Sequence, residues 1–187
     1  VSMGVGYGSF GQSLSKKGLA ESVPYAGTRL VTLTKDDVRQ IYIARTALEP
    51  VAAKYACEKI TDEDIQNLKE IHAEYIRIVR QEELDAIDVY QQNRLYHFSI
   101  YKISQLDRIC AMIESLWDNL SFFKLIYGQK LLEGRESRER MIEEHQSYLD
   151  ALKQRDSERI KSFIGSESEE ENGEYSLLFG CVFHENA

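Results

Sequence analysis

Residues 38–57 have the sequence VRQIYIARTALEPVAAKYAC, in which apolar residues recur at the spacing of one helix face. The members of this stripe are Val38, Ile41, Leu48, Ala52 and Tyr55. Just ahead of it, Thr34 and Asp37 have the spacing of a capping box, with Asp in place of the usual Glu. The segment therefore predicts one long amphipathic helix over about residues 34–58.

The helical pattern continues through most of the remaining chain. Thr61 and Asp64 repeat the capping-box spacing at the start of the next segment. Further helices are predicted at about residues 61–81, 84–103, 105–131, 135–154 and 156–168. Only two prolines occur in 187 residues, and the connections are short. These features favour an all-α fold, an antiparallel bundle.

The segments that flank the helices differ in character. Ala20–Val23 and Thr28–Leu33 are β-like runs on either side of a Pro-Tyr-Ala-Gly turn, so a small β-hairpin is predicted. The acidic run from Ser166, SESEEENGE, is expected to be solvated. Residues 175–183 are apolar again and are predicted to cap the bundle.

The formal net charge of −8 is unevenly distributed. Residues 1–33 contain Lys16, Lys17 and Arg29 against Glu21, which gives +2 and leaves −10 for the rest of the chain. An acidic body does not bind nucleic acid by counterion release. Any DNA contact is therefore expected in the N-terminal segment.

Cysteine usage and hydropathy indicate the compartment. Cys57, Cys110 and Cys181 are odd in number and form no CxxC pair, so we expect reduced thiols in a cytoplasmic protein. No apolar run reaches about 18 residues, and no membrane partner is expected. The sequence also lacks GxSxG, Walker A, GxGxxG and HExxH motifs, so no catalytic residue is predicted.

Arg45 lies within the apolar stripe of the first predicted helix. A guanidinium that faces a core needs an anion or several acceptors. Two interpretations follow. Arg45 forms a structural ion pair, with Glu49 one turn on as the partner, or it binds the carboxylate or phosphate of a ligand.

Polar side chains also fall on the apolar faces of three later helices. Asn93 and His97 are spaced i, i+4, so both can reach one ion. His145 lies within the stripe formed by residues such as Leu149, and Glu167 continues the apolar face of the last predicted helix. A lone histidine on an apolar face is more often a hydrogen-bonded core residue. Three helices that each send a polar group inward make a shared metal site plausible, for Zn, Ni, Mn or Fe.

The other histidines and the aromatic residues have simpler interpretations. His72 and His184 are predicted to lie on the surface. The aromatic run of Trp117, Phe122, Phe123 and Tyr127 is predicted to belong to the core or to a dimer interface rather than to a cofactor site.

Four segments together resemble FadR-type members of the GntR family of bacterial transcription regulators. VRQIYIARTALEPVAAKYAC, NRLYHFSIYKIS and EEHQSYLDALKQRD are similar to three helices of the FCD ligand-binding domain. LSKKGLAESVPYAGTRLVTLTKDD resembles the end of a winged helix and its link to the sensor domain. The resemblance implies a partial winged helix at residues 1–33 and an FCD domain at residues 34–187.

The resemblance also implies a function. FCD domains are bundles of six or seven helices, usually dimeric, whose cavity binds a small carboxylate metabolite, often through a divalent metal. The family's metal ligands, one Asp or Asn and three His, correspond to Asn93, His97 and His145, with Glu167 where the family has His. We therefore expect a ligand-sensing and dimerisation domain, with Arg45, Asn93, His97 and His145 as ligand-binding residues.

The N-terminal segment departs from the family pattern. Val1-Ser2 is followed by a glycine-rich stretch without the arginines of the family's recognition helix, so specific DNA binding by this chain is not expected. Two alternatives stay open. One is a helical metalloenzyme that uses Asn93, His97, His145 and Glu167, and the other is a dimerisation module with an inactive pocket.

Overall fold

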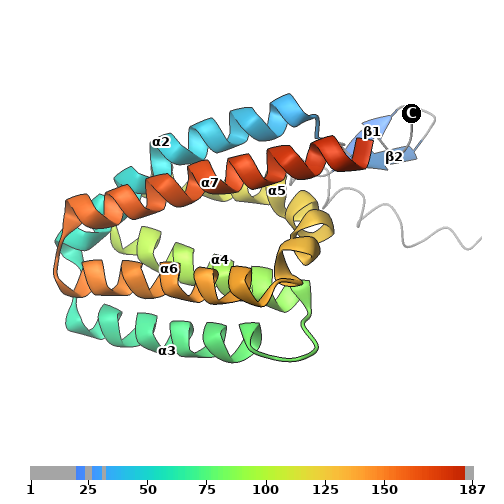
Figure 1. Cartoon of the computed structure of the whole chain (residues 1–187). Coiled ribbons are helices and arrows are strands. Elements are labelled where there is room, and N and C mark those ends of the chain that lie inside the picture. Colours follow the sequence, from blue (N-terminus) through green and yellow to red (C-terminus); the bar gives the residue numbers. More distant parts are fainter. Residues whose placement is uncertain (1–19, 24–26, 31–32, 184–187) are drawn as a thin grey trace, which may run out of the picture.

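The computed structural model describes residues 20–23, 27–30 and 33–183, and within them a hairpin precedes a bundle of six helices (Figure 1). The helices are α2 (Lys35–Lys59), α3 (Asp62–Val79), α4 (Ala86–Ile103), α5 (Asp107–Leu132), α6 (Arg135–Lys153) and α7 (Ser157–Phe183). The hairpin pairs β1 (Ala20–Val23) with β2 (Gly27–Leu30) in antiparallel register. The predicted all-α bundle and the predicted hairpin are both confirmed.

Local capping sets the first two helix starts. The Thr34 hydroxyl accepts a hydrogen bond from the Asp37 amide at 3.1 Å, and the Asp37 carboxylate accepts one from the Thr34 amide at 2.8 Å. Thr61 and Asp64 repeat this arrangement at 3.1 Å and 2.9 Å. Both capping boxes predicted from the sequence are therefore present, and each satisfies two backbone groups that a helix end leaves open.

The last helix is longer than predicted. α7 continues through the acidic run to Phe183, and Ser166, Glu169 and Glu170 are exposed as expected, but one face of the run is not solvated. Ser168 is fully buried, and the Glu171 carboxylate pairs with basic side chains of α2 and α5. Residues 175–183 belong to the same helix, and their side chains lie outside the described residues.

The bundle places the first and last helices side by side (Figure 1). α4 packs against α2, α3 and α5, and α6 packs against α3 and α7. Aromatic side chains fill the space between them, and those of Tyr96, Trp117 and Tyr148 are at most 1% exposed. Burial of such large apolar groups is the dominant stabilising contribution in a bundle of this kind.

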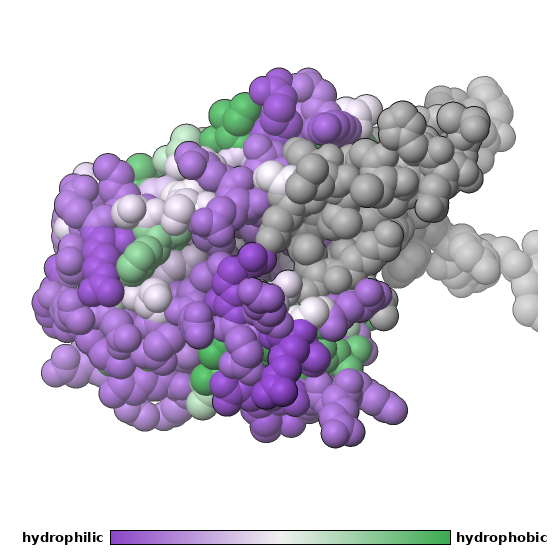
Figure 2. All heavy atoms as spheres, in the orientation of Figure 1, coloured by the Kyte–Doolittle hydropathy of each residue, from purple (hydrophilic) through white to green (hydrophobic). Residues whose placement is uncertain are grey.

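The surface is largely hydrophilic on the face shown in Figure 2, with small separate hydrophobic patches. Tyr55, predicted to belong to the buried stripe of α2, is 43% exposed because it lies at the edge of the buried face. Across the described part of the chain, no helix has the length and apolar character needed to cross a membrane.

Candidate metal and effector site

Two histidines from different helices meet inside the bundle. His97 of α4 is fully buried and His145 of α6 is 2% exposed. Their Nε2 atoms lie 3.3 Å apart. The structure thus brings to one position the two imidazoles that the sequence predicted to share a site.

Glu167 completes this cluster from a third helix. One of its carboxylate oxygens lies 3.4 Å from His97 Nε2, and the other accepts a hydrogen bond of 2.6 Å from the Tyr148 hydroxyl. Glu167 reaches this position because α7 continues as a helix past Gly165. Asn93, one turn before His97, lines the same cavity as His145 and Glu167.

A hydrogen-bond chain fixes the orientation of the His97 ring. The Tyr101 hydroxyl donates to the Glu49 carboxylate at 3.1 Å, and His97 Nδ1 lies 3.2 Å from that hydroxyl. Since the Tyr101 proton is committed to Glu49, His97 Nδ1 must donate to Tyr101. When the ring is neutral, Nε2 carries the lone pair that a metal needs; when the ring is protonated, Nε2 donates to the Glu167 carboxylate, 3.4 Å away. Such a relay is typical of histidines that ligate metals.

His145 is held by aromatic stacking. Its ring centroid lies 4.3 Å from those of Tyr75 and Tyr96, and its Nδ1 atom is buried without a hydrogen-bond partner. Burial, together with the nearby His97 and His72 rings, holds the pKa of His145 well below its usual value. His145 is therefore neutral at physiological pH, the form in which imidazole binds a metal.

The Glu167 carboxylate is ionised in this setting. Burial alone would raise its pKa, but His97 and the hydrogen bond from Tyr148 lower the pKa of Glu167 below its ordinary range. Its side chain is 11% exposed. The cluster therefore offers a negative oxygen and two imidazole nitrogens in a mostly buried position.

The distances fit part of a metal site. Two ligands about 2.0–2.2 Å from a tetrahedral ion lie about 3.3–3.6 Å apart, and the two measured separations of 3.3 Å and 3.4 Å match this range. Within the described residues, however, no three His, Cys, Asp or Glu side chains already have the geometry of a metal site. The two imidazoles fit as they stand, and the Glu167 carboxylate would have to adjust.

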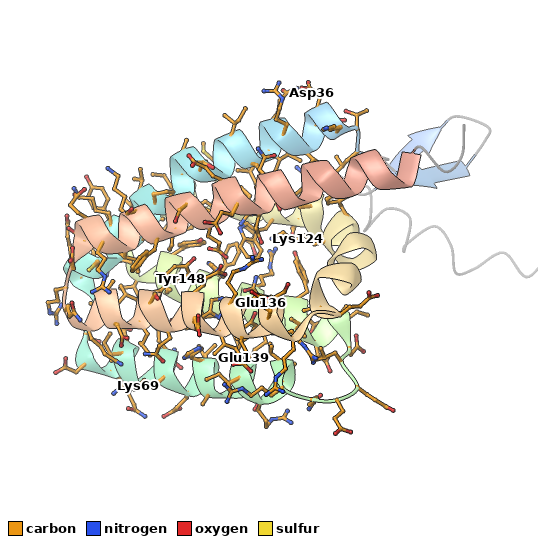
Figure 3. All side chains as sticks on the ribbon, viewed as in Figure 1. Asp36, Lys69, Lys124, Glu136, Glu139 and Tyr148 are labelled. Atoms are coloured by element: carbon orange, nitrogen blue, oxygen red, sulfur yellow. The ribbon has the colours of Figure 1, made fainter. Side chains whose placement is uncertain are left out.

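The cluster lies at a cavity of about 100 Å³ between α4, α5, α6 and α7. Val89, Leu132 and Met141 are among its apolar lining residues, and His145 and Glu167 are among its polar ones. Lys124 also lines it. In Figure 3 the side chains of Lys124 and Tyr148 lie inside the bundle, whereas Lys69 and Asp36 project outward. An apolar pocket with a few converging polar groups is the usual form of a small-molecule site.

Arg45 lies behind this cavity rather than in its lining. Its side chain is 1% exposed, donates to Glu49 at 2.6 Å and donates to Glu171 at 2.9 Å. The ion pair with Glu49, one of the two interpretations of the sequence, is therefore present. Direct contact of Arg45 with a ligand stays a prediction.

Glu49 is the centre of a fully buried polar network. Besides Arg45 and Tyr101, its carboxylate accepts hydrogen bonds from Trp117 Nε1 at 2.7 Å and from the Ser168 hydroxyl at 3.3 Å. Four helices contribute these donors, so the network ties α2 to α4, α5 and α7. Trp117 belongs to the core, as predicted, and so does Phe123. The side chains of Phe122 and Tyr127 lie outside the described residues.

His72 was wrongly predicted to lie on the surface. It is 3% exposed, its Nε2 lies 3.3 Å from the Ile142 carbonyl oxygen, and its ring packs 6.0 Å from that of His145. Leu68, Tyr75 and Val79 share its helix face and are also buried, so this spacing was the signal that could have identified it. His184 lies outside the described residues.

The family model described as "FCD domain" matches residues 40–165 of this chain. The chain belongs to the FCD domain family. Within this FCD chain, the family match covers α3, α4, α5 and α6 completely and most of α2. His97 and His145 lie within the matched region, whereas Glu167 and Glu171 lie just beyond it.

The FCD chain is similar to a curated relative and to solved structures. The HTH-type transcriptional regulator McbR of Escherichia coli (strain K12) is 32% identical over 139 residues, which are 74% of this chain and 58% of McbR. The chain thus spans less than two thirds of that relative's length. The solved structure of E. coli McbR/YncC has a TM-score of 0.79 at 23% identity, over 90% of this chain and 82% of that one.

A GntR family member from Pseudomonas syringae pv. tomato has a TM-score of 0.69 at 18% identity, over 94% of this chain and 70% of that one. At such identities the solved structures establish the fold. Among these relatives, McbR and the Pseudomonas syringae protein are named as transcriptional regulators. The metalloenzyme alternative therefore receives no support.

Proposed function

We propose that this chain is the effector-sensing and dimerisation part of a GntR-type transcription regulator, with the effector bound in the cavity between α4 and α7. The observation that carries the proposal is the buried pair of His97 and His145, beside Glu167, at a cavity that His145 and Glu167 line in an FCD fold. Residues 34–187 form the sensing domain in this proposal, and residues 1–33 belong to a winged helix.

The polar cluster supports a divalent ion, Zn, Ni, Mn or Fe, held by His97, His145 and Glu167 with Asn93 as the fourth ligand. The donor types and the Nε2 orientation of His97 support this assignment. When bound, the ion would supply a positive centre at which a small carboxylate can coordinate.

The ion pairs of Glu171 support a route for the signal. Glu171 lines the cavity and pairs with Arg45 of α2, the helix that follows the hairpin along the chain. A ligand that draws Glu171 away from Arg45 would favour a different packing of α2. In the intact regulator, such a shift between two states would change the affinity for DNA.

Homodimerisation and the lack of specific DNA binding by this chain belong to the same proposal. Light scattering should give twice the 21.6 kDa mass of one chain at micromolar concentration, and a monomer mass would contradict it. A mobility-shift experiment should show no sequence-dependent binding at physiological salt. Tight, sequence-dependent binding would overturn that expectation.

The effector site is tested by the melting temperature of the chelator-treated protein. Addition of Zn²⁺, Ni²⁺ or Mn²⁺ should raise the melting temperature, because an ion that binds only the folded state stabilises it. Addition of a small carboxylate together with the ion should raise it further. If no ion and no small molecule changes the melting temperature, the dimerisation module with an inactive pocket is the better description.

A further inference from the structure

The cavity has an excess of acidic side chains. Glutamates outnumber Lys and Arg in its lining by four to two. Glu167, Glu170 and Glu171 come from one helix at i, i+3 and i+4 spacing, which places them on one face. Glu144 comes from the facing helix α6.

The two basic side chains in the lining are already matched. Lys124 Nζ lies 2.8 Å from the Glu171 carboxylate, and Arg140 Nε lies 3.7 Å from that of Glu144. The third base nearby, Arg45, is shared between Glu171 and Glu49. Burial, together with the nearby Glu167 carboxylate, raises the pKa of Glu144 to about 8, so this wall disfavours further negative charge, and the exposed Glu170 adds another carboxylate to the lining.

A second observation points to a ligand at the same wall. His145 lines the cavity, is 2% exposed, and has a buried Nδ1 atom without a hydrogen-bond partner. Buried polar atoms in folded proteins are nearly always hydrogen-bonded, so an orphan of this kind indicates a partner that is not part of the chain.

We propose that the effector carries a positively charged amine, which binds among Glu144, Glu167 and Glu170. The proposal rests on the proposed function, because it concerns the same cavity, and it narrows the class of effector. An ammonium group has three donors and no acceptor, so it complements a wall of carboxylates. A ligand with only negative charge would add to an existing excess, and its charge would be poorly screened in a partly buried pocket.

A divalent ion would offset part of the negative charge of the lining, but it would do so at the histidine cluster and not beside Glu170. It would take its ligands from His97, His145 and Glu167, and Glu170 would stay without a matching base in the lining. An effector with both an amine and a carboxylate can place its carboxylate on the ion and its amine among the glutamates. The amine is the feature that the acidic wall requires in either case.

The test uses three five-carbon probes that differ only in their charged groups: pentylamine, 5-aminopentanoate and pentanoate. Binding to the full chain is measured by calorimetry, once with chelator and once with Zn²⁺. We expect the two amine-bearing probes to bind at least about tenfold more tightly than pentanoate, the factor that one charge-assisted hydrogen bond supplies. The difference between 5-aminopentanoate and pentanoate isolates the contribution of the ammonium group.

Matched variants locate the amine. Glu144→Gln and Glu170→Gln should each weaken binding of pentylamine by about fivefold or more. Glu143→Gln and Glu169→Gln, their exposed neighbours outside the lining, should leave it unchanged. Melting curves without ligand establish that each variant is folded. If one of the two lining variants does not fold, the other still tests where the amine binds.

The outcomes separate this inference from the proposed function. Binding of pentanoate as tight as that of 5-aminopentanoate overturns the amine and leaves an effector site in place. Equal binding of pentylamine to all four variants also overturns it, because the amine then lies elsewhere. If no probe binds and no metal changes the melting temperature, both proposals fail.

Discussion

Glu171 of α7 accepts a hydrogen bond of 2.9 Å from Arg45 of α2, although 126 positions separate the two residues in the chain. The same carboxylate accepts a hydrogen bond of 2.8 Å from Lys124 of α5. One side chain at the edge of the cavity therefore joins three helices. Arg45 extends this connection inward, because its guanidinium also pairs with the buried Glu49.

Replacement of Arg45 by Met should destabilise the fold. The change leaves the fully buried Glu49 without its basic partner and removes one of two bases from Glu171. Breaking a buried ion pair on one side costs about 3–5 kcal/mol, which urea unfolding should detect. Arg39→Met, which breaks an exposed pair with Asp36, should leave the unfolding free energy close to that of the parent chain, because solvent screens such pairs.

A stable Arg45→Met variant would assign Arg45 a different role. If Arg45→Met folds as stably as the parent chain but loses binding of a carboxylate probe, the guanidinium is a ligand anchor rather than a structural ion pair. Melting curves and calorimetry on the same preparation distinguish the two roles.

The ion pairs of Glu171 predict a loss of stability in acid. Burial alone would raise the pKa of Glu171, but Lys124 and Arg45 lower it from 4.5 to about 2. Because the folded pKa is below the unfolded one, the contribution to stability is fully present above pH 4.5 and is lost as the pH falls toward 2. The difference in unfolding free energy between the parent and Glu171→Gln should therefore be constant from pH 7 to pH 5.

Below pH 4.5 that difference should shrink, by about 1.4 kcal/mol for each further pH unit. Urea unfolding at pH 7, 5, 4 and 3.5 measures it. Glu169→Gln, at an exposed position on the same helix, controls for the loss of one carboxylate from α7. A difference that stays constant down to pH 3.5 would show that the ion pairs of Glu171 do not stabilise the fold.

The sequence predicted those structural features that depend on residues close together in the chain. The capping boxes at Thr34 and Thr61 depend on residues three positions apart, and both helix starts were predictable. The meeting of His97 and His145 was also predictable, because each lies on the apolar face of its own helix. The buried faces of helices in one bundle pack against each other, so residues on those faces are brought close together.

The acidic part of α7 was not predictable for the opposite reason. A run such as SESEEENGE is typical of a solvated segment, and its helix is stabilised by Arg45 and Lys124, which are far away in the chain. Only the fold brings these bases opposite Glu171. The burial of His72 was missed although Leu68 and Tyr75 gave a local signal.

The imidazole pair makes a specific prediction for metal binding. His97→Ala and His145→Ala should each remove the metal-dependent rise in melting temperature, and the double variant should lose no more than either single one. The reason is that one ion needs both nitrogens. His72→Gln, which alters a buried histidine outside the pair, should keep the metal-dependent rise. Metal-dependent stabilisation that survives in both single variants would show that the two are ordinary core histidines.

Tyr101 should affect metal binding without touching the ion. Its hydroxyl accepts the Nδ1 proton of His97 and donates its own proton to Glu49, so it holds the Nε2 lone pair of His97 toward the site. Tyr101→Phe removes both hydrogen bonds and keeps the ring. Loss of such an outer partner lowers metal affinity by about 10–100-fold. A competition titration with a chromophoric chelator measures that affinity directly.

Tyr75→Phe is the matched control for Tyr101→Phe. Tyr75 is equally buried and packs on the His145 ring, but its hydroxyl has no hydrogen-bond partner among the described residues. Its removal should leave the metal affinity unchanged and the metal-free melting temperature unchanged or higher, because a buried unpaired polar group is lost. If both variants bind metal equally well, the relay through Tyr101 does not orient His97. If both bind it equally weakly, the effect comes from general loosening of the aromatic core.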